Sequence, residues 1–228
     1  MIMKIRIFTV LLLCVLLTGC LNTKKPPEQP TESVPAETIV EETEIAAVIQ
    51  PLPDTTMESI RDSIVHVSFG QEDVYQDDSG NICLRVQVYS YDQFDMVDIS
   101  GLKAGDTILL SGEAVQVHSV KRNDYGTVLV NGGLDEGGFD LATDDSGIYF
   151  VHGYSDMKTW NLVGEVEYPV SDDFVFTDSA DLEKDEVIYS AEDLLDSIPA
   201  EEYGYHPQNT TIRMENGLVV AMERIYTP

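Results

Sequence analysis

The sequence predicts a mostly β domain behind a long, disordered N-terminal tether. Short apolar runs alternate with turn residues at intervals of roughly ten residues over 57–228. Leu84, Val86 and Val88 alternate with polar or amphipathic neighbours, which is typical of a half-buried strand. Residues 21–56 hold six of the ten prolines, many Glu and Thr, and no aromatic residue. Such a segment buries too little apolar surface to offset its chain entropy.

The folded region is expected to consist of antiparallel hairpins arranged in small barrel-like or sandwich elements. The pattern predicts strands over 64–69, 82–91, 107–110, 114–120, 127–130, 148–151, 163–168, 174–176, 187–189, 211–215 and 218–226. Asn216-Gly217 predicts a tight hairpin because both central residues of that turn require a positive φ. Turn residues at 77–81 and 121–126 predict two further connections.

One or two short helices complete the prediction. Residues 190–198 read as a helix that Ser190 caps and Pro199 stops, with acidic residues in its first turn. Residues 94–100 predict a second short helix, in which Phe94 and Val97 would face the core.

The first twenty residues have the organisation of a bacterial export signal. Lys4 and Arg6 precede an apolar run over 7–17, which is the length of a signal-peptide core and only about half of a membrane span. The run ends in Leu17-Thr18-Gly19-Cys20, after which the chain turns polar. The competing interpretation is an ordinary secretory signal with a cysteine there by chance.

The Leu17–Cys20 tetrapeptide resembles the lipobox of bacterial lipoproteins. The resemblance implies cleavage after Gly19, lipidation of Cys20 and attachment to the extracytoplasmic face of the cell membrane, with membrane lipid as a partner. Two acyl chains hold a protein firmly on a bilayer, whereas one is marginal. The predicted organisation is therefore a signal peptide over 1–19, a lipidated tether over 20–56 and a β-rich domain over 57–228.

The chain is strongly acidic, which excludes one class of partner. It carries 13 basic and 41 acidic side chains, for a net charge of −28. Loss of 1–19 would remove two basic residues and leave about −30. Such a surface repels nucleic acid phosphates and anionic lipid headgroups. We therefore expect no nucleic acid partner and an anchor that depends on the lipid.

Acidic loop residues are the candidates for a metal site. The glycine-rich stretch 131–140 can bend around an ion, and calcium is bound by several carboxylate and carbonyl oxygens. The candidate ligands are Asp135, Glu136, Asp140, Asp144 and Asp145. No cofactor is predicted outright, since acidic residues beside glycine are also ordinary turn formers. If the β region has two subdomains, the same stretch is where we would divide them.

Tyr154 and Trp160 are the candidate ligand platform. They flank a connection that contains polar residues, and an exposed aromatic ring beside Asp and Asn suits a polyol. The competing interpretation is packing in the core or at a strand edge. Cys83 sits in a strand-like context and is interpreted as a small buried residue.

Two further resemblances bear on the fold. Residues 101–117 are similar to the glycine-turn hairpins of small β-barrels, a likeness that implies fold and no particular function. The whole chain resembles uncharacterised surface lipoproteins of Gram-positive bacteria, a group that supplies no catalytic motif to transfer.

The function most consistent with these features is a non-enzymatic binding or interaction module with a glycan or protein ligand. The sequence contains neither a G-x-S-x-G elbow nor an H-x-x-H metal pair, so no catalytic residue is assigned. One alternative is a hydrolase of envelope or other polysaccharides that uses loop carboxylates. Another is a surface scaffold stabilised by calcium.

Overall fold

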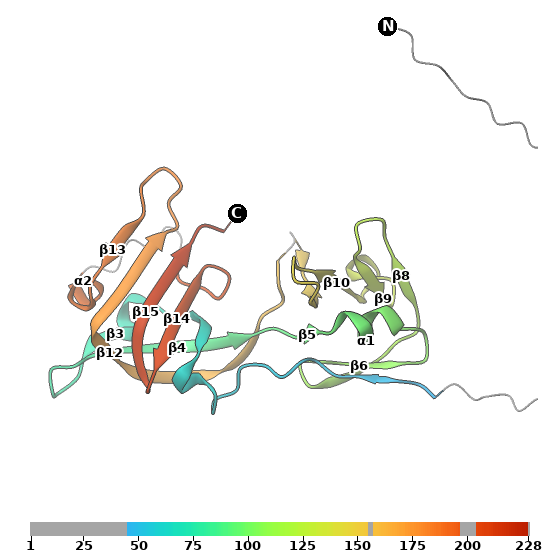
Figure 1. The fold of residues 1–228 in the computed structure, drawn as a ribbon, viewed down its shortest axis with the longest axis horizontal. Helices are drawn as coiled ribbons and strands as arrows, with labels where there is room; N and C mark the ends of the chain where they lie inside the picture. Colours follow the sequence, from blue (N-terminus) through green and yellow to red (C-terminus); the bar gives the residue numbers. More distant parts are fainter. Residues whose placement is uncertain (1–44, 155–156, 197–203, 228) are drawn as a thin grey trace, which may run out of the picture. The chain divides into compact units, whose positions relative to one another are not determined.

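The computed structural model describes residues 45–154, 157–196 and 204–227, which are mostly β as predicted (Figure 1). Short helices are α1 (Met96–Gly101), α2 (Ala191–Asp196) and three 3₁₀ turns, η1 (Ile60–Asp62), η2 (Gln71–Asp73) and η3 (Leu134–Glu136). The strands are β1 (Val48–Ile49), β2 (Ile64–Ser68), β3 (Val74–Gln76), β4 (Ile82–Ser90), β5 (Gln93–Phe94), β6 (Thr107–Leu110), β7 (Glu113–Gln116), β8 (Val120–Arg122), β9 (Val128–Val130), β10 (Phe139–Thr143), β11 (Tyr149–His152), β12 (Asn161–Ser179), β13 (Val187–Tyr189), β14 (Thr210–Glu215) and β15 (Leu218–Ile225).

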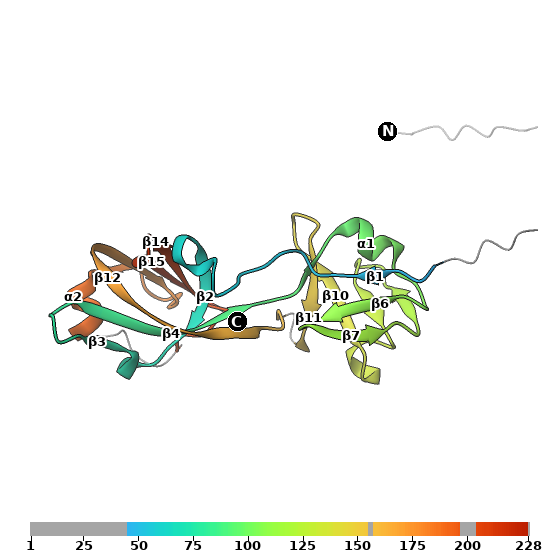
Figure 2. The same cartoon turned by 90° about the horizontal axis from the view of Figure 1, so that it is seen from below.

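Five strands close into a barrel. Their order is β2, β4, β12, β15 and β14, and β14 pairs again with β2. Closure depends on the 19-residue strand β12, whose first part pairs with β4 and whose second part pairs with β15. Its register shifts between Val170 and Val175, where the strand passes from one neighbour to the other. Figure 2 shows β4 and β12 side by side.

The connectivity of this barrel is that of an OB-fold. Numbered within the barrel, the strands run 1-2-3-5-4-1, every pair is antiparallel except the third with the fifth, and α2 lies between the third and fourth. Strands β3 and β13 extend the sheet beyond the barrel by pairing with β4 and β12.

Alternation along each strand fills the barrel. The buried side chains include Val86 and Val88 of β4, Phe176 of β12, and Ile212 and Met214 of β14. Leu194 of α2 is fully buried in the same cluster, while Leu195 packs partly against it. The other side of each strand therefore faces outward, and this alternation creates the surfaces considered below.

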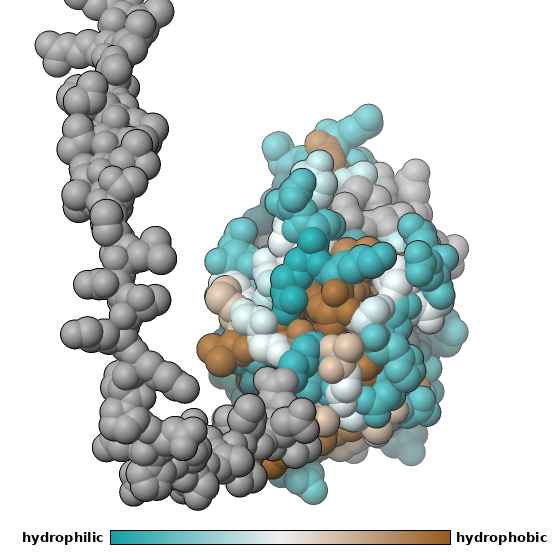
Figure 3. Space-filling model, turned by 90° about the vertical axis from the view of Figure 1, so that its right-hand side faces the viewer, coloured by the Kyte–Doolittle hydropathy of each residue, from teal (hydrophilic) through white to brown (hydrophobic). Residues whose placement is uncertain are grey.

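The chain between β4 and β12, together with β1, forms a second group of strands with its own core. One sheet has the order β1-β6-β7 and the other β5-β11-β10-β9-β8. Phe94, Ile99, Ile108 and Leu141 are fully buried between them. The outer surface visible in Figure 3 is largely hydrophilic, with apolar residues gathered near its centre.

The structure corrects the boundaries of the predicted tether. The tether was expected to reach residue 56, yet Val48–Ile49 forms β1 in parallel with β6, and Ile49 is buried. The buried carboxylate of Asp106 accepts a hydrogen bond from the Ala47 amide, which fixes this segment. Composition could not reveal that partner. Several predictions lie outside the described residues: the signal peptide over 1–19, its processing residues Leu17, Thr18 and Gly19, the lipidation site Cys20, and the tether over 20–44.

The glycine-rich stretch 131–140 does not separate two subdomains. It connects β9 to β10, which are neighbours in one sheet. The glycines are there because the turn between these strands is tight. Gly132 and Gly133 have positive φ, and a Cβ on Gly138 would lie 2.1 Å from the Val130 carbonyl oxygen. The stretch is a tight turn within one sheet rather than a linker.

Most predicted elements are confirmed, with instructive exceptions. Asn216 and Gly217 have φ values of 53° and 79° and join β14 to β15. The predicted strands 163–168 and 174–176 are instead parts of the single strand β12. In α1 the prediction for Val97 is wrong: it is 78% exposed and Ile99 is buried in its place.

Candidate functional site

The candidate site is the outer surface of β2, β4 and β12. Strand register places Ser68, Gln87 and Glu165 in one row across the three strands. Arg85 pairs with Glu167 in the next row on one side, and Tyr89 pairs with His66 on the other. We call this surface the β4 face and define it as Ser68, Asp73, Tyr75, Arg85, Gln87, Tyr89, Glu165 and Glu167.

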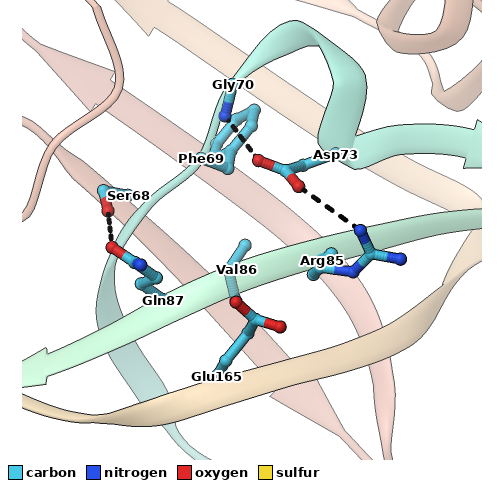
Figure 4. Close-up of a pocket in the computed structure, with 8 residues that line it drawn as sticks. All are labelled: Ser68, Phe69, Gly70, Asp73, Arg85, Val86, Gln87 and Glu165. Carbon is cyan, nitrogen blue, oxygen red and sulfur yellow. Dashed lines mark hydrogen bonds and ion pairs between the residues drawn. The ribbon is translucent and has the colours of Figure 1, made fainter.

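A hollow of about 220 Å³ lies in the β4 face (Figure 4). Residues from β2, β4 and β12 line it, together with the segment that leads into η2. The Asp73 carboxylate accepts a hydrogen bond from the Gly70 amide at 2.8 Å and holds this segment at the rim. Figure 4 shows the Glu165 side chain extending from β12 toward β4. The hollow is therefore framed by regular strands and one fixed turn.

Arg85 forms a flat, charge-compensated platform with Tyr75. Its guanidinium lies 5.6 Å from the centre of the Tyr75 ring and 3.2 Å from a carboxylate oxygen of Glu167, while Asp73 is 3.9 Å away. The Tyr75 hydroxyl also donates to Glu167, and this hydrogen bond, with the one from Arg85, holds the pKa of the Glu167 carboxyl below its usual value. The same bond raises the pKa of Tyr75. These contacts hold the Arg85 guanidinium in place beside the Tyr75 ring.

The centre of the β4 face is a small network of neutral polar groups. Ser68 donates to the Gln87 side-chain oxygen at 3.3 Å, and the Tyr89 hydroxyl donates to the same oxygen at 2.8 Å. The Ser68 and Tyr89 hydroxyls are themselves 3.2 Å apart. The Gln87 amide nitrogen forms no hydrogen bond to any described residue, so its two N–H groups remain able to donate to a ligand.

Glu165 supplies a carboxylate that has no partner among the residues the structure describes. It is exposed at the hollow, and among the described residues it forms neither a hydrogen bond nor an ion pair. Its neighbours across the sheet are Gln87 and, one strand further, Ser68. A carboxylate, an amide and a hydroxyl in one row form an acceptor and donor set that matches a polyhydroxyl ligand.

The charges on the β4 face disfavour an anionic ligand. Three carboxylates, Asp73, Glu165 and Glu167, surround the single guanidinium of Arg85. Two of these carboxylates already compensate Arg85, so no free cation is offered to a phosphate or sulfate.

The predicted metal ligands do not come together as a group. Asp135 and Asp140 line a hollow of about 190 Å³, but Asp140 accepts a hydrogen bond from the Leu134 amide and Glu136 does not line the hollow. Asp144 and Asp145 lie in the exposed β10–β11 turn. Within residues 45–154, 157–196 and 204–227, no three His, Cys, Asp or Glu side chains are placed to hold a metal ion.

The turn residue Asp144 acts as an ordinary cap of its own loop. Its Oδ1 atom accepts from the Ser146 amide, the Ser146 hydroxyl and the Ile148 amide. These bonds, led by the one from the Ser146 hydroxyl, lower the pKa of the Asp144 carboxyl.

The two residues of the predicted platform occupy different environments. Tyr154 is 71% exposed and lines the same small hollow as Asp135 and Asp140. Trp160 is only partly exposed, because its ring lies 4.4 Å from the His66 ring and 5.1 Å from the Tyr91 ring. The structure thus does not join Tyr154 and Trp160 into one aromatic surface; Trp160 belongs to a packed aromatic cluster.

Cys83 is buried, which confirms its interpretation as a small core residue. Burial raises the pKa of its thiol, which lowers its reactivity.

Sequence reasoning missed the residues of the β4 face as a site. The alternation around 84–89 correctly predicted that Arg85, Gln87 and Tyr89 share one side of a strand. It contained no signal that β12, some 80 residues later, brings Glu165 and Glu167 beside them.

Comparisons with protein-family models, with curated proteins and with solved structures found no match to this chain. In the part of the chain that the structure describes, no helix has the length and apolar character needed to cross a membrane.

Proposed function

We propose that this protein is a non-enzymatic binding module, held at the extracytoplasmic face of the membrane through lipid on Cys20, that recognises a neutral glycan on its β4 face. The anchoring part rests on the resemblance of Leu17–Cys20 to a lipobox. The binding part rests on one observation: the unpartnered Glu165 carboxylate lies in one row with Gln87 and Ser68, beside the Tyr75–Arg85 platform.

The position of this surface in the fold supports the proposal. OB-fold barrels bind oligonucleotides and oligosaccharides on their second and third strands, which here are β4 and β12. The net charge of −28 and the carboxylates around Arg85 disfavour an oligonucleotide. An uncharged oligosaccharide meets no such repulsion.

The side chains of the β4 face match the apolar faces and the hydroxyl groups of a sugar. A sugar ring presents an apolar face that can stack on Tyr75 and its neighbouring guanidinium, and a rim of hydroxyls that donate and accept. Glu165 can accept from two neighbouring hydroxyls, while the Gln87 amide can donate to a third. Because Arg85 is already fixed by Glu167, the platform would lose little conformational freedom on binding.

Isothermal titration calorimetry with soluble neutral hexasaccharides tests the proposal. The probes are cellohexaose, xylohexaose, mannohexaose and chitohexaose, with a heparin hexasaccharide as the anionic comparison. We expect at least one neutral probe to bind and the heparin fragment not to bind. Tyr75→Ala, which removes the stacking ring, and Glu165→Ala, which removes the carboxylate, should each weaken binding about tenfold or more, equal to about 1.4 kcal/mol of binding free energy.

Two matched variants control for loss of a ring or a charge elsewhere. Tyr125→Ala removes a tyrosine that is 94% exposed in the β8–β9 turn, and Glu113→Ala removes an exposed carboxylate of β7. Both should bind as the unmodified chain does. If no neutral probe binds, or if the control variants lose as much affinity as the β4-face variants, the proposal is wrong.

A further inference from the structure

The end of the β4 face that lies away from the Tyr75–Arg85 platform carries a second apolar contact. Strand register places Tyr89 directly beside Leu162 of β12. Leu162 is 60% exposed and Tyr89 is half-buried. The Tyr89 hydroxyl donates to the Gln87 side chain two residues back on the same strand, so the tyrosine lies along the sheet rather than standing away from it. We call Tyr89 and Leu162 the apolar end.

A bulge in β12 directs Leu162 to this surface. The register of β12 against β4 shifts between Leu162 and Gly164, which makes Val163 an extra residue, and Val163 packs against the barrel core. Side chains alternate along a regular strand, so with Glu165 outside, Leu162 would point inward without the extra residue. Bulges re-aim side chains in this way beside functional sites. The bulge therefore completes the apolar end.

The β4 face is bounded at both ends, which fixes its length. The outward position of β4 before the platform is Cys83, which is buried. The outward position after the apolar end is Tyr91, whose ring packs edge-on against Trp160 with 5.1 Å between the ring centres. The outward positions of β4 that stay open between these limits are Arg85, Gln87 and Tyr89.

The spacing of the contacts along β4 matches a short stretch of a linear glycan. At about 3.3 Å per residue, the four steps from Arg85 to Tyr89 cover about 13 Å, a span that exceeds one pyranose ring and matches about three linked rings. The contacts also come in the order that three rings need. The two outer rings stack on the platform and on the apolar end, and the hydroxyls of the middle ring meet Gln87 and Glu165.

We infer that the β4 face binds three consecutive sugar units of a linear, neutral glycan that runs along β4. This inference rests on the proposed function and adds the length and the direction of the ligand. A chain that crossed the strands instead would contact a single row of residues and leave the platform or the apolar end without a ring. Leu162 thereby becomes a residue that sets the minimum length of the ligand.

Isothermal titration calorimetry with the di-, tri-, tetra- and hexasaccharides of the cellulose, xylan, mannan and chitin series tests this inference. In the series that binds, affinity should rise about tenfold or more from disaccharide to trisaccharide, because the third ring reaches the apolar end, and change little thereafter. Leu162→Gln should abolish that rise. Leu182→Gln is the matched control, since Leu182 is 73% exposed in the β12–β13 turn, and it should bind every length as the unmodified chain does. Thermal melts check that both variants fold.

The length series separates failure of the inference from failure of the proposed function. If none of the neutral hexasaccharides binds, the proposed function is wrong and the inference falls with it. If a hexasaccharide binds but its disaccharide binds equally tightly, or if affinity keeps rising beyond the tetrasaccharide, the glycan site stands and the inference is overturned. An undiminished rise in Leu162→Gln, or an equal loss in Leu182→Gln, would overturn it as well.

Discussion

Arg224 and Asp178 form a buried, bidentate ion pair inside the barrel. The two residues lie directly opposite one another on the parallel strands β15 and β12. Arg224 Nε donates to Asp178 Oδ1 at 2.9 Å and Nη2 donates to Oδ2 at 2.5 Å. The side chains are only 3% and 9% exposed, and the Tyr205 ring lies 4.5 Å from the guanidinium. Tyr205, which packs on this pair, is itself buried, and its burial raises the pKa of its hydroxyl.

Removal of one member of this pair should destabilise the barrel strongly. Asp178→Asn leaves the Arg224 charge buried without its counter-ion, which costs about 3–5 kcal/mol in free energy of unfolding. Urea unfolding followed by circular dichroism measures the change. The exposed pair of Arg213 and Glu215 is the control, and Arg213→Gln should cost at most about 1 kcal/mol. Equal costs for the two variants would show that the buried pair has no special role.

Mild acid should destabilise the fold through His66. The His66 Nδ1–H donates to the Pro207 carbonyl at 2.9 Å, and the ring stacks near Trp160. Burial, and secondarily the charge of Lys158, lowers the pKa of His66 below its usual 6.5. The unfolded chain therefore binds more protons than the folded chain between the two pKa values, so stability is present above about pH 6.5 and falls as the pH drops through the folded-state pKa.

Thermal melts between pH 8 and pH 5 measure this dependence. His66→Asn retains a side-chain N–H near the Nδ1 position but does not titrate, so its melting temperature should fall less steeply with pH. His118→Asn is the control, because His118 is exposed on the surface, and it should leave the slope unchanged. His206, whose pKa is also lowered by burial, contributes to the slope that remains. A full slope in His66→Asn would contradict the assignment.

Calcium should leave the melting temperature nearly unchanged. Asp144 Oδ1 already accepts three hydrogen bonds within its turn, and Asp140 is bonded to the Leu134 amide. A melt with millimolar calcium, one with magnesium and one with a chelator should therefore agree. A ligand at a hundred times its Kd would stabilise by about 2.7 kcal/mol. A rise specific to calcium would restore Asp135, Glu136, Asp140, Asp144 and Asp145 as candidate ligands.

Substitution of Cys20 should release the protein from the membrane. Cys20→Ala removes the thiol that the lipobox resemblance predicts to be acylated. Fractionation of bacteria that express the chain should then find it outside the membrane pellet. Cys14→Ala is the matched control, since Cys14 lies within the predicted signal peptide and its loss should not alter membrane association. Retention of Cys20→Ala in the pellet would refute the lipidation.

Local signals were reliable wherever a short segment fixes its own conformation. The Asn216-Gly217 hairpin was predicted from two residues because few others accept its positive φ values, and the structure confirms it. The prediction failed at β12, where it placed two strands, 163–168 and 174–176, separated by residues 169–173. The strand continues through them because it changes partner there, from β4 to β15.

By itself, the sequence determined the β class, the alternation of inner and outer side chains, most turns, and the strong acidity from which we expect no nucleic acid partner. These properties depend on a few neighbouring residues or on composition. Only the tertiary structure decided which strands are neighbours. Asp178 meets Arg224, and Glu165 meets Gln87, because the barrel closes across sequence separations of 46 and 78 residues. Such pairings follow from the packing of the whole core, which no short segment encodes.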